Sequence, residues 1–276
     1  ASFCEEHGFK TLKKRWTEDS QGDGTSDPGD AKGHKRIPKA KAKREYTTVD
    51  TPELLQQLKD GLLNSGGFAV DTETTSIDAM RARLVGMSFC WEPGVAWYVP
   101  LNLTDSLLAP AAGKTNDDFD PVQLLAPILA DASIPKVGQN IKYDAHILRR
   151  HGAPIAGITF DTMVAHFLLH PTQRHNLDAL SLSYLDLTKI PTKELLGTGK
   201  NALTMDLVPI PSVSEYACED ADSTWQLSQL LSKELEEAEP ELGKLLLEME
   251  LPLLSVLERM EANGICVDPK PLRELD

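Results

Sequence analysis

Cysteines are few in this sequence, and long apolar runs are missing. Four cysteines are scattered through 276 residues, and no two of them form a Cys-x-x-Cys pair. This pattern argues against a zinc ribbon or a disulfide framework and fits a reducing compartment. No apolar run approaches the roughly 18 residues of a transmembrane helix, and no segment has the pattern of a signal peptide. We therefore expect a cytoplasmic protein that has no membrane partner and acts as a monomer.

Basic residues are scarce outside the first 45 positions. Residues 1–45 carry 11 Lys and Arg against 8 Asp and Glu, whereas the remainder carries 17 basic and 34 acidic residues. An acidic domain is a poor nonspecific binder of nucleic acid, because its overall field repels phosphates. If this domain acts on nucleic acid, metal ions and local hydrogen-bond donors must hold the phosphates.

The N-terminal part has the composition of a linker. Residues 17–31 are rich in Gly, Ser, Asp and Pro and show no periodicity, which is typical of a flexible segment. Residues 32–44 contain seven Lys and Arg. This basic run is either a solvated tether or a weak contact with phosphates. We expect a flexible linker over residues 17–45.

Hydrophobic periodicity predicts alternating strands and helices from Tyr46 onward. Thr51 is a candidate N-cap for a first helix with Pro52 at its first position. Further elements are expected as strands at Phe68–Thr74, Arg83–Cys90, Val95–Leu101, Pro135–Gly138 and Ile158–Asp161, and as helices at Pro121–Ala132, Asn140–Arg150, Asp161–His170, from Asn176, Val213–Glu237 and Leu242–Asn263. Thr188–Pro211 is expected to be irregular. This order predicts an α/β fold with a mixed sheet and helices on both faces.

The strand at Phe68–Thr74 ends in two carboxylates, Asp71 and Glu73. Strand side chains alternate between faces, so residues i and i+2 point the same way. Two like charges side by side repel, and a hard divalent cation removes that conflict because Mg²⁺ and Mn²⁺ prefer carboxylate oxygens. The pair alone is also compatible with a solvated strand end.

Two later helices carry further candidate groups at i,i+4 spacing. Asn140 and Asp144 are expected to share one helix face, as are Tyr216 and Asp220. Four acids on three elements could converge on two metal ions, which suits phosphoryl transfer. A phenol beside the attacking water could orient it. Taken singly, Asp144 could be a solvated helix residue, and Tyr216 could belong to the core.

Other polar residues are candidates for separate sites or roles. His166 and His170 are four residues apart on a helix and could bind zinc, although the sequence supplies no nearby third ligand. Glu219 and Asp222 flank the third motif, and we expect them to be solvated. Asp161 opens a helix and is better interpreted as an N-cap.

These motifs, in this order, resemble the three exonuclease motifs of the four-acid (DEDD) superfamily, and Tyr-x-x-x-Asp is typical of its tyrosine subclass. The sequence is similar to the 3′–5′ proofreading domain of family A (bacterial DNA polymerase I) polymerases from about Tyr46 to Leu235. The similarity includes Leu84–Phe89, Glu92–Val95, Val137–Asn140, Phe160–Met163, Gly199–Asn201 and Tyr216–Asp222.

The resemblance implies a domain order. Residues 46–237 would be the 3′–5′ exonuclease domain, with a ribonuclease H-like fold. Residues 1–16 resemble the end of a 5′ nuclease domain, and residues 238–276 resemble the start of the helical polymerase thumb. We therefore expect this chain to be a fragment of a longer DNA polymerase and to lack the palm and fingers that such a polymerase needs.

The resemblance also implies roles for individual residues. Asp71, Glu73 and Asp220 would hold a first Mg²⁺ or Mn²⁺ ion, Asp71 with Asp144 would hold a second, and Tyr216 would orient the attacking water. The residues implied in substrate binding are Thr74 and Ile77 under the terminal nucleotide, Gln139, Asn140 and Tyr143 along the strand, and Met205 where the family usually has an aromatic wedge.

The implied activity is metal-dependent removal of nucleoside monophosphates from single-stranded or frayed DNA 3′ ends, in a polymerase of replication and repair. Two alternatives remain open: an RNA-trimming exonuclease of the same superfamily, and an inactive module that only positions primer and template. The presence of all four acids and the tyrosine favours an enzyme.

Overall fold

The structure is a computed structural model that describes residues 44–101, 120–199, 202–268 and 273. These residues belong to one compact unit, residues 36–276. The segment expected to end a 5′ nuclease domain (1–16), all but the last two residues of the linker (17–45) and all but the last residue of its basic run (32–44) lie outside the described residues, as do Lys200 and Asn201. The expectations for these parts stay predictions.

A mixed six-stranded sheet forms the centre of the fold, with the strand order β1-β4-β3-β2-β5-β6. β2 pairs antiparallel with β3, and β3 antiparallel with β4, whereas the other pairs are parallel. The strands are β1 (Glu45–Thr48), β2 (Phe68–Thr74), β3 (Leu84–Glu92), β4 (Val95–Pro100), β5 (Lys136–Gly138) and β6 (Ile158–Asp161). The expected mixed sheet is confirmed. The additional strand is β1, a short edge strand whose four residues, Glu-Tyr-Thr-Thr, carry little periodic signal.

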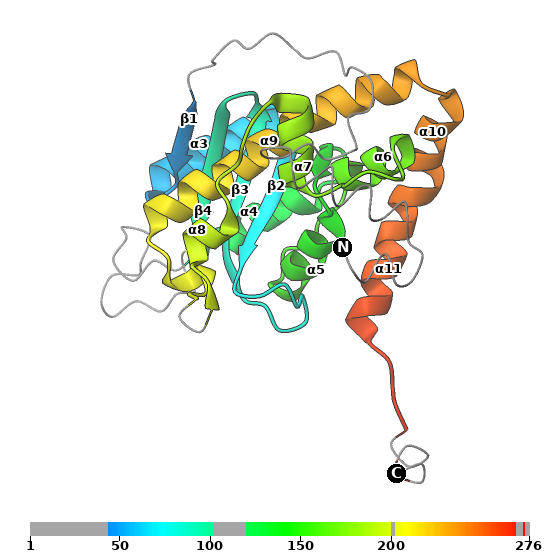
Figure 1. Cartoon of the computed structure of the whole chain (residues 1–276). Helices are drawn as coiled ribbons and strands as arrows, with labels where there is room; N and C mark the ends of the chain where they lie inside the picture. The colour runs from blue at the N-terminus through cyan, green and yellow to red at the C-terminus, as the bar shows by residue number, and fades with distance from the viewer. Residues whose placement is uncertain (1–43, 102–119, 200–201, 269–272, 274–276) are drawn as a thin grey trace, which may run out of the picture. The chain divides into compact units, whose positions relative to one another are not determined.

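Helices cover both faces of the sheet (Figure 1). The longest, α9 (Ile210–Glu237), packs across β1 to β5, while α3 (Pro52–Asn64) and α4 (Pro121–Ala130) contact each other on the opposite side. The remaining helices before α9 are α5 (Ile141–Arg150), α6 (Thr162–Leu169), α7 (Leu177–Leu180), the π-helical turn η2 (Ser181–Leu185), α8 (Thr192–Leu196) and the 3₁₀ turn η4 (Met205–Leu207). Thr51 caps α3 through its side chain, as expected.

Several elements differ from those expected. α9 begins at Ile210, because Pro211 is tolerated in a first helical turn, where no intrahelical N–H bond is needed. Asn140 occupies the N-cap position of α5 in a left-handed conformation (φ 58°), without a side-chain capping hydrogen bond, so it is not part of the helix one turn before Asp144. Helix α8 lies within the stretch expected to be irregular.

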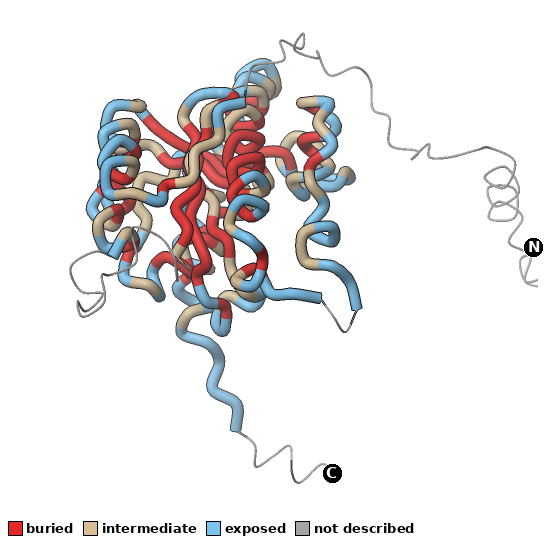
Figure 2. The backbone as a smooth tube through the Cα atoms, turned by 90° about the vertical axis from the view of Figure 1, so that its left-hand side faces the viewer, coloured by how far each residue is buried: buried red, intermediate tan, exposed pale blue. Residues whose placement is uncertain are grey.

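The core lies along the central strands and the inner face of α9. Phe68, Ala69 and Val70 of β2 are fully buried, and Figure 2 shows buried residues running through the centre of the unit with exposed residues around them. The strand that ends in Asp71 and Glu73 is therefore held on both faces. Such packing gives the carboxylates at its end a rigid support.

The C-terminal helices α10 (Pro240–Leu245), η5 (Leu246–Glu250) and α11 (Leu251–Asn263) replace the single expected helix at Leu242–Asn263. α11 packs against α5, where Glu258 is ion-paired with Arg149 and Glu261 with Lys142. The assignment of residues 238–276 to a polymerase thumb stays a prediction. Within the described ranges, none of the helices has the length and apolar character needed to cross a membrane.

Candidate active site

Three carboxylates from two elements meet at the end of β2. Asp71 and Glu73 project from the sheet face that α9 covers, and Asp220 projects from α9 toward them. One oxygen from each of the three lies within 4.8 Å of the others. The expected pairing of Asp71 and Glu73 on one face, and the arrival of Asp220 beside them, follow from strand alternation and from the path of α9 across the sheet.

Burial makes this cluster electrostatically unfavourable without a cation. Glu73 is only 5% exposed, and burial followed by the charge of Asp71 raises the pKa of its carboxyl well above the usual range. Burial also raises the pKa of Asp71 to about 6, against an opposing effect of the Lys189 ammonium. Among the described residues, Glu73 Oε1 finds no hydrogen-bond partner. A buried acceptor without a partner and an all-oxygen donor set fit a hard divalent cation.

Asp144, the fourth acid, lies apart from these three. Its Oδ1 accepts hydrogen bonds from the Thr72 backbone N–H (3.0 Å) and from the Thr72 hydroxyl (2.6 Å). Burial, with a contribution from the charge of Asp71, raises the pKa of Asp144. The structure thus brings three of the four acids into one cluster and holds the fourth nearby on β2 through Thr72, a residue that the sequence analysis did not identify.

Tyr216 lies one helical turn before Asp220 and is half-buried. Its hydroxyl is 3.0 Å from the hydroxyl oxygen of Thr192 at the start of α8. Burial and the nearby charge of Glu73 raise the pKa of the Tyr216 phenol. The phenol therefore stays protonated at neutral pH, which suits a group that donates a hydrogen bond and does not accept a proton.

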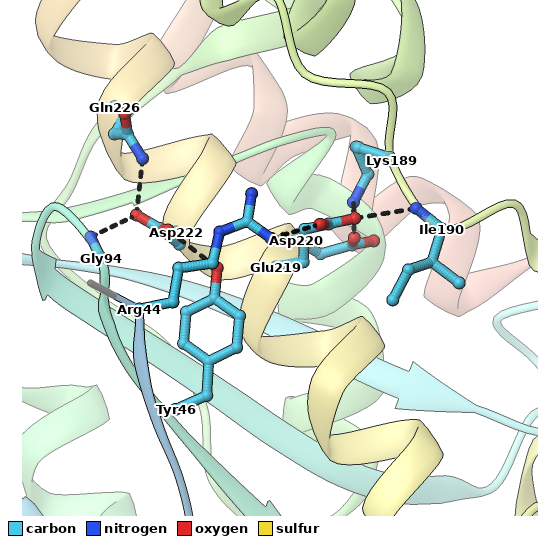
Figure 3. A network of polar contacts seen from close by, with 9 residues as sticks. All are labelled: Arg44, Tyr46, Gly94, Lys189, Ile190, Glu219, Asp220, Asp222 and Gln226. Atoms are coloured by element: carbon cyan, nitrogen blue, oxygen red, sulfur yellow. Dashed lines mark hydrogen bonds and ion pairs between the residues drawn. The ribbon is translucent and has the colours of Figure 1, made fainter. Parts of the chain in front are cut away.

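Lys189 is a charged residue of the site that the sequence analysis missed. It precedes α8, and its side chain is 2% exposed. Its ammonium is ion-paired with Asp220 Oδ1 (Figure 3). The ammonium also lies 5.4 Å from the centre of the Tyr216 ring. A single lysine in an irregular stretch carries no motif, so only the spatial contact reveals it.

The expectation that Glu219 and Asp222 are solvated is wrong, because both are buried. Glu219 accepts hydrogen bonds from Arg44 and from the backbone N–H of Ile190. The donors to Asp222 are the Tyr46 hydroxyl, the Gly94 backbone N–H and the Gln226 side chain, at 2.8 to 2.9 Å (Figure 3). α9 has no solvated face at this point, since β1, the β3–β4 turn and the segment before α8 all contact it.

The residues expected to bind substrate have different environments. The Thr74 and Tyr143 hydroxyl oxygens are 2.5 Å apart, and Tyr143 also donates to the Ser76 carbonyl at 2.5 Å. Ile77 is 98% exposed, which leaves it open to a ligand. Gln139 donates to the His175 carbonyl and accepts from the Thr162 hydroxyl.

Met205 does not present its side chain to solvent, because it is only 6% exposed in the turn η4. The expected contact with a frayed base is therefore not available in this conformation. The exposed apolar residues beside it are Leu203 and Leu207.

The histidines do not form a metal site in this conformation. His166 Nδ1 lies 2.7 Å from His175 Nδ1, and His170 Nε2 lies 2.8 Å from Glu234 Oε1. The acidic cluster is the sole group of three or more possible ligands found in the described part of the chain. Asp161 is the N-cap of α6, as expected, and also accepts from the Ile141 N–H.

Comparison with known proteins decides the family. A family model described as 3′–5′ exonuclease matches residues 46–236. The chain belongs to this exonuclease family. It is 38% identical to DNA polymerase I of Pseudomonas aeruginosa over 245 residues, and the aligned region covers 83% of this chain and 26% of that protein. It is 35% identical to DNA polymerase I of Chloroflexus aurantiacus over 231 residues, and the aligned region covers 83% of this chain and 24% of that protein.

Solved structures agree with this assignment. The exonuclease domain is similar to the POL domain of Pol1 from M. smegmatis in complex with DNA primer-template and dNTP, with a TM-score of 0.62 and 25% identity over 83% of this chain and 34% of that chain. Escherichia coli RNase D shares the fold, with a TM-score of 0.56 and 17% identity over 78% of this chain and 51% of that chain. The chain spans about a quarter of the length of the curated relatives. The resemblance to the 3′–5′ exonuclease domain of bacterial DNA polymerase I and the ribonuclease H-like fold class are confirmed.

Proposed function

We propose that this exonuclease domain removes nucleoside monophosphates from DNA 3′ ends with two divalent metal ions, as part of a DNA polymerase I of replication and repair. The observation that carries this proposal is the buried cluster of Asp71, Glu73 and Asp220 within 4.8 Å, with one carboxylate oxygen that lacks a partner in the described structure. Such a cluster costs stability by itself, and a bound cation offsets that cost.

Asp71, Glu73 and Asp220 would hold one ion, and Asp144 together with Asp71 the second. Bound Mg²⁺ or Mn²⁺ supplies an activated water and stabilises the leaving oxygen. Thr72 keeps Asp144 oriented through two hydrogen bonds. Tyr216 remains a neutral phenol next to the cluster, so its part is to orient the attacking water by a hydrogen bond, and Thr192 positions its hydroxyl.

The domain is acidic overall, so its field repels the phosphates of a nucleic acid. The substrate strand would therefore be held by metal ions and by local side chains. Exposed Ile77 and the Thr74–Tyr143 hydroxyl pair lie at the end of β2 and on the adjacent helix α5, where they would contact the terminal nucleotide. Gln139 and Asn140 precede α5 and would contact the strand further along. Met205 would contribute only after a rearrangement that exposes it.

DNA is the proposed substrate because the relatives with the higher identity are DNA polymerases and the M. smegmatis structure contains DNA primer-template. RNA is the alternative substrate that the sequence analysis left open. The fold neighbours include E. coli RNase D, described as an exoribonuclease, and Brucella melitensis NrnC bound to pGG (TM-score 0.57, 21% identity). These neighbours are less than 25% identical, so they support the fold and not the substrate.

The test is digestion of matched single-stranded DNA and RNA oligonucleotides that carry a 5′ label. Wild-type protein is expected to shorten the DNA from its 3′ end with Mg²⁺ or Mn²⁺ and to stop in EDTA, whereas Glu73→Gln should be inactive. Glu215→Gln is the matched control, since Glu215 is exposed on the same helix as Asp220. Preference for RNA would overturn the substrate assignment. Binding of DNA without any metal-dependent shortening would favour a positioning module over an enzyme.

A further inference from the structure

Lys189 is a buried cation inside the acidic cluster. Its ammonium is ion-paired with Asp220 Oδ1 and lies 3.8 Å from Glu219 Oε1. Asp178, Asp71 and Glu73 are also close enough for their charges to act on it. Burying a charge is unfavourable unless it is paired, so a lysine that is 2% exposed must be held by these carboxylates.

The two carboxylates nearest to Lys189 differ in what else they bind. Glu219 accepts from Arg44 and from the Ile190 N–H, so its charge is compensated without the lysine. Asp220 belongs to the three-carboxylate cluster, and Lys189 is the cation ion-paired with it in the described structure. The ammonium therefore provides positive charge at the place where the proposed metal ion would provide it.

We propose that Lys189 is an internal counter-ion that stabilises the metal-free exonuclease site and competes with the first metal ion for Asp220. The inference rests on the proposed function, because it assumes that Asp71, Glu73 and Asp220 bind a divalent ion. A metal ion and an ammonium cannot both approach one carboxylate closely without repelling each other. Glu219 offers the ammonium a second partner 3.8 Å away when the metal takes Asp220.

This competition links metal binding to the segment before α8. Lys189 and Ile190 are adjacent, and Ile190 donates to the same Glu219 that would receive the displaced ammonium. Two residues later, Thr192 contacts the Tyr216 hydroxyl. A shift of Lys189 from Asp220 toward Glu219 therefore takes place within the segment that positions the phenol. Lys189 is a positioning residue that acts through Asp220 and Tyr216.

The first test measures Mn²⁺ affinity and thermal stability of the whole chain, independently of cleavage. Lys189→Met keeps the length of the side chain and removes its charge. We expect Mn²⁺ to bind more tightly, by roughly 5- to 150-fold, as is common for two coupled binding events. We also expect the Tm of Lys189→Met in EDTA to be lower than that of wild type, and the difference between the two proteins to be smaller in saturating Mn²⁺. Lys193→Met is the control, because Lys193 is exposed four residues away and should change neither quantity.

The outcomes separate this inference from the proposed function. Binding of Mn²⁺ by wild type and none by Asp71→Asn would support the metal site. If Lys189→Met then binds Mn²⁺ as tightly as wild type or more weakly, the counter-ion role is overturned and the metal site remains. No binding by wild type would overturn the metal site itself, and the inference with it. A Lys189→Met protein that folds in Mn²⁺ but not in EDTA would support the inference.

A second measurement uses unaltered protein and does not depend on folding of the variant. The side-chain ammonium resonance of Lys189, observed by ¹⁵N NMR, is expected to shift when Mg²⁺ is added, because its partner changes from Asp220 to Glu219. The Lys193 resonance should not move. A Lys189 resonance that stays constant through saturation with Mg²⁺ would overturn the proposal.

Discussion

Two buried acids of α9, Asp220 and Asp222, lie two residues apart but have opposite surroundings. Asp222 accepts from three N–H and O–H donors, the Tyr46 hydroxyl, the Gly94 N–H and the Gln226 amide, and the Cys90 thiol lies 4.0 Å from its Oδ1. Asp220, on the side of β2, meets two other carboxylates and one lysine. Figure 3 shows Asp222 with its donors and Asp220 with Lys189 along the same helix. The number of donors around each carboxylate, and not its burial, distinguishes an acid that supports the fold from one that is available to a metal ion.

The comparison is tested most strongly by removing an acid of the cluster. Asp71→Ala should reduce cleavage by roughly 10³-fold or more, as expected for loss of a group on which the reaction depends. The free energy of unfolding in EDTA should stay equal or rise, because the charge that opposes ionisation of Glu73 is gone. Single-turnover digestion and thermal melts check both parts. Undiminished cleavage would contradict the site.

Removing the well-satisfied acid should have the reverse effect. Asp222→Ala leaves the three donors without their acceptor, so the free energy of unfolding should fall by about 2–5 kcal/mol. Cleavage per folded molecule at low temperature should change much less than in Asp71→Ala. Chemical denaturation measures the loss, with Glu215→Ala as the exposed control on the same helix. A stability equal to that of wild type would show that these hydrogen bonds contribute little.

The pH dependence of stability should also separate the two groups. The pKa of Asp71 is raised to about 6 in the folded state, so the folded protein binds more protons than the unfolded chain between about pH 4 and 6. Stability in EDTA should therefore fall as pH rises through this range. Saturating Mg²⁺ should weaken or reverse this trend, because it binds the ionised form. Melting curves from pH 4 to 7 of wild type and Asp71→Asn test this, and equal slopes between pH 4 and 6 would contradict it.

A smaller effect is expected at Tyr216. Tyr216→Phe keeps the ring and removes the hydroxyl that contacts Thr192. Cleavage should slow by less than the roughly 10²–10⁴-fold that is typical of losing a general acid or base. DNA affinity should stay the same. Tyr143→Phe is the matched comparison, since it removes the contacts to Thr74 and Ser76 and should weaken binding more than the rate. If Tyr216→Phe cleaves at the wild-type rate, the Tyr216 hydroxyl has no part in the reaction and the ring only packs in the core.

The smallest effect concerns Met205. Its position in the family suggests that Met205→Phe should tighten binding of a single-stranded 3′ end, because stacking on an aromatic contributes about 1–3 kcal/mol per base. Its burial in η4 favours a different outcome, a loss of about 1–3 kcal/mol of stability from overpacking. Affinity and denaturation measurements on one protein sample distinguish the two. Tighter binding with unchanged stability would show that the turn opens to expose this side chain.

Much of the fold followed from local patterns. Alternation along Phe68–Thr74 predicted that Asp71 and Glu73 share a face, and the turn at Glu92–Gly94 predicted the β3–β4 hairpin. The Tyr-x-x-x-Asp motif predicted that α9 carries the third element of the site. Each of these inferences depends on residues within about one turn or one hairpin of one another, where backbone geometry alone sets the direction of the side chains.

The sequence by itself determined the fold class, the family and the identity of the acids. Only the tertiary structure decided which groups are paired. Lys189 reaches Asp220 across 31 residues, and Tyr46 reaches Asp222 across 176. Thr72 holds Asp144 on one side of β2 across 72 residues. The charge balance of the site depends on contacts between distant segments, and no periodicity along the chain encodes them.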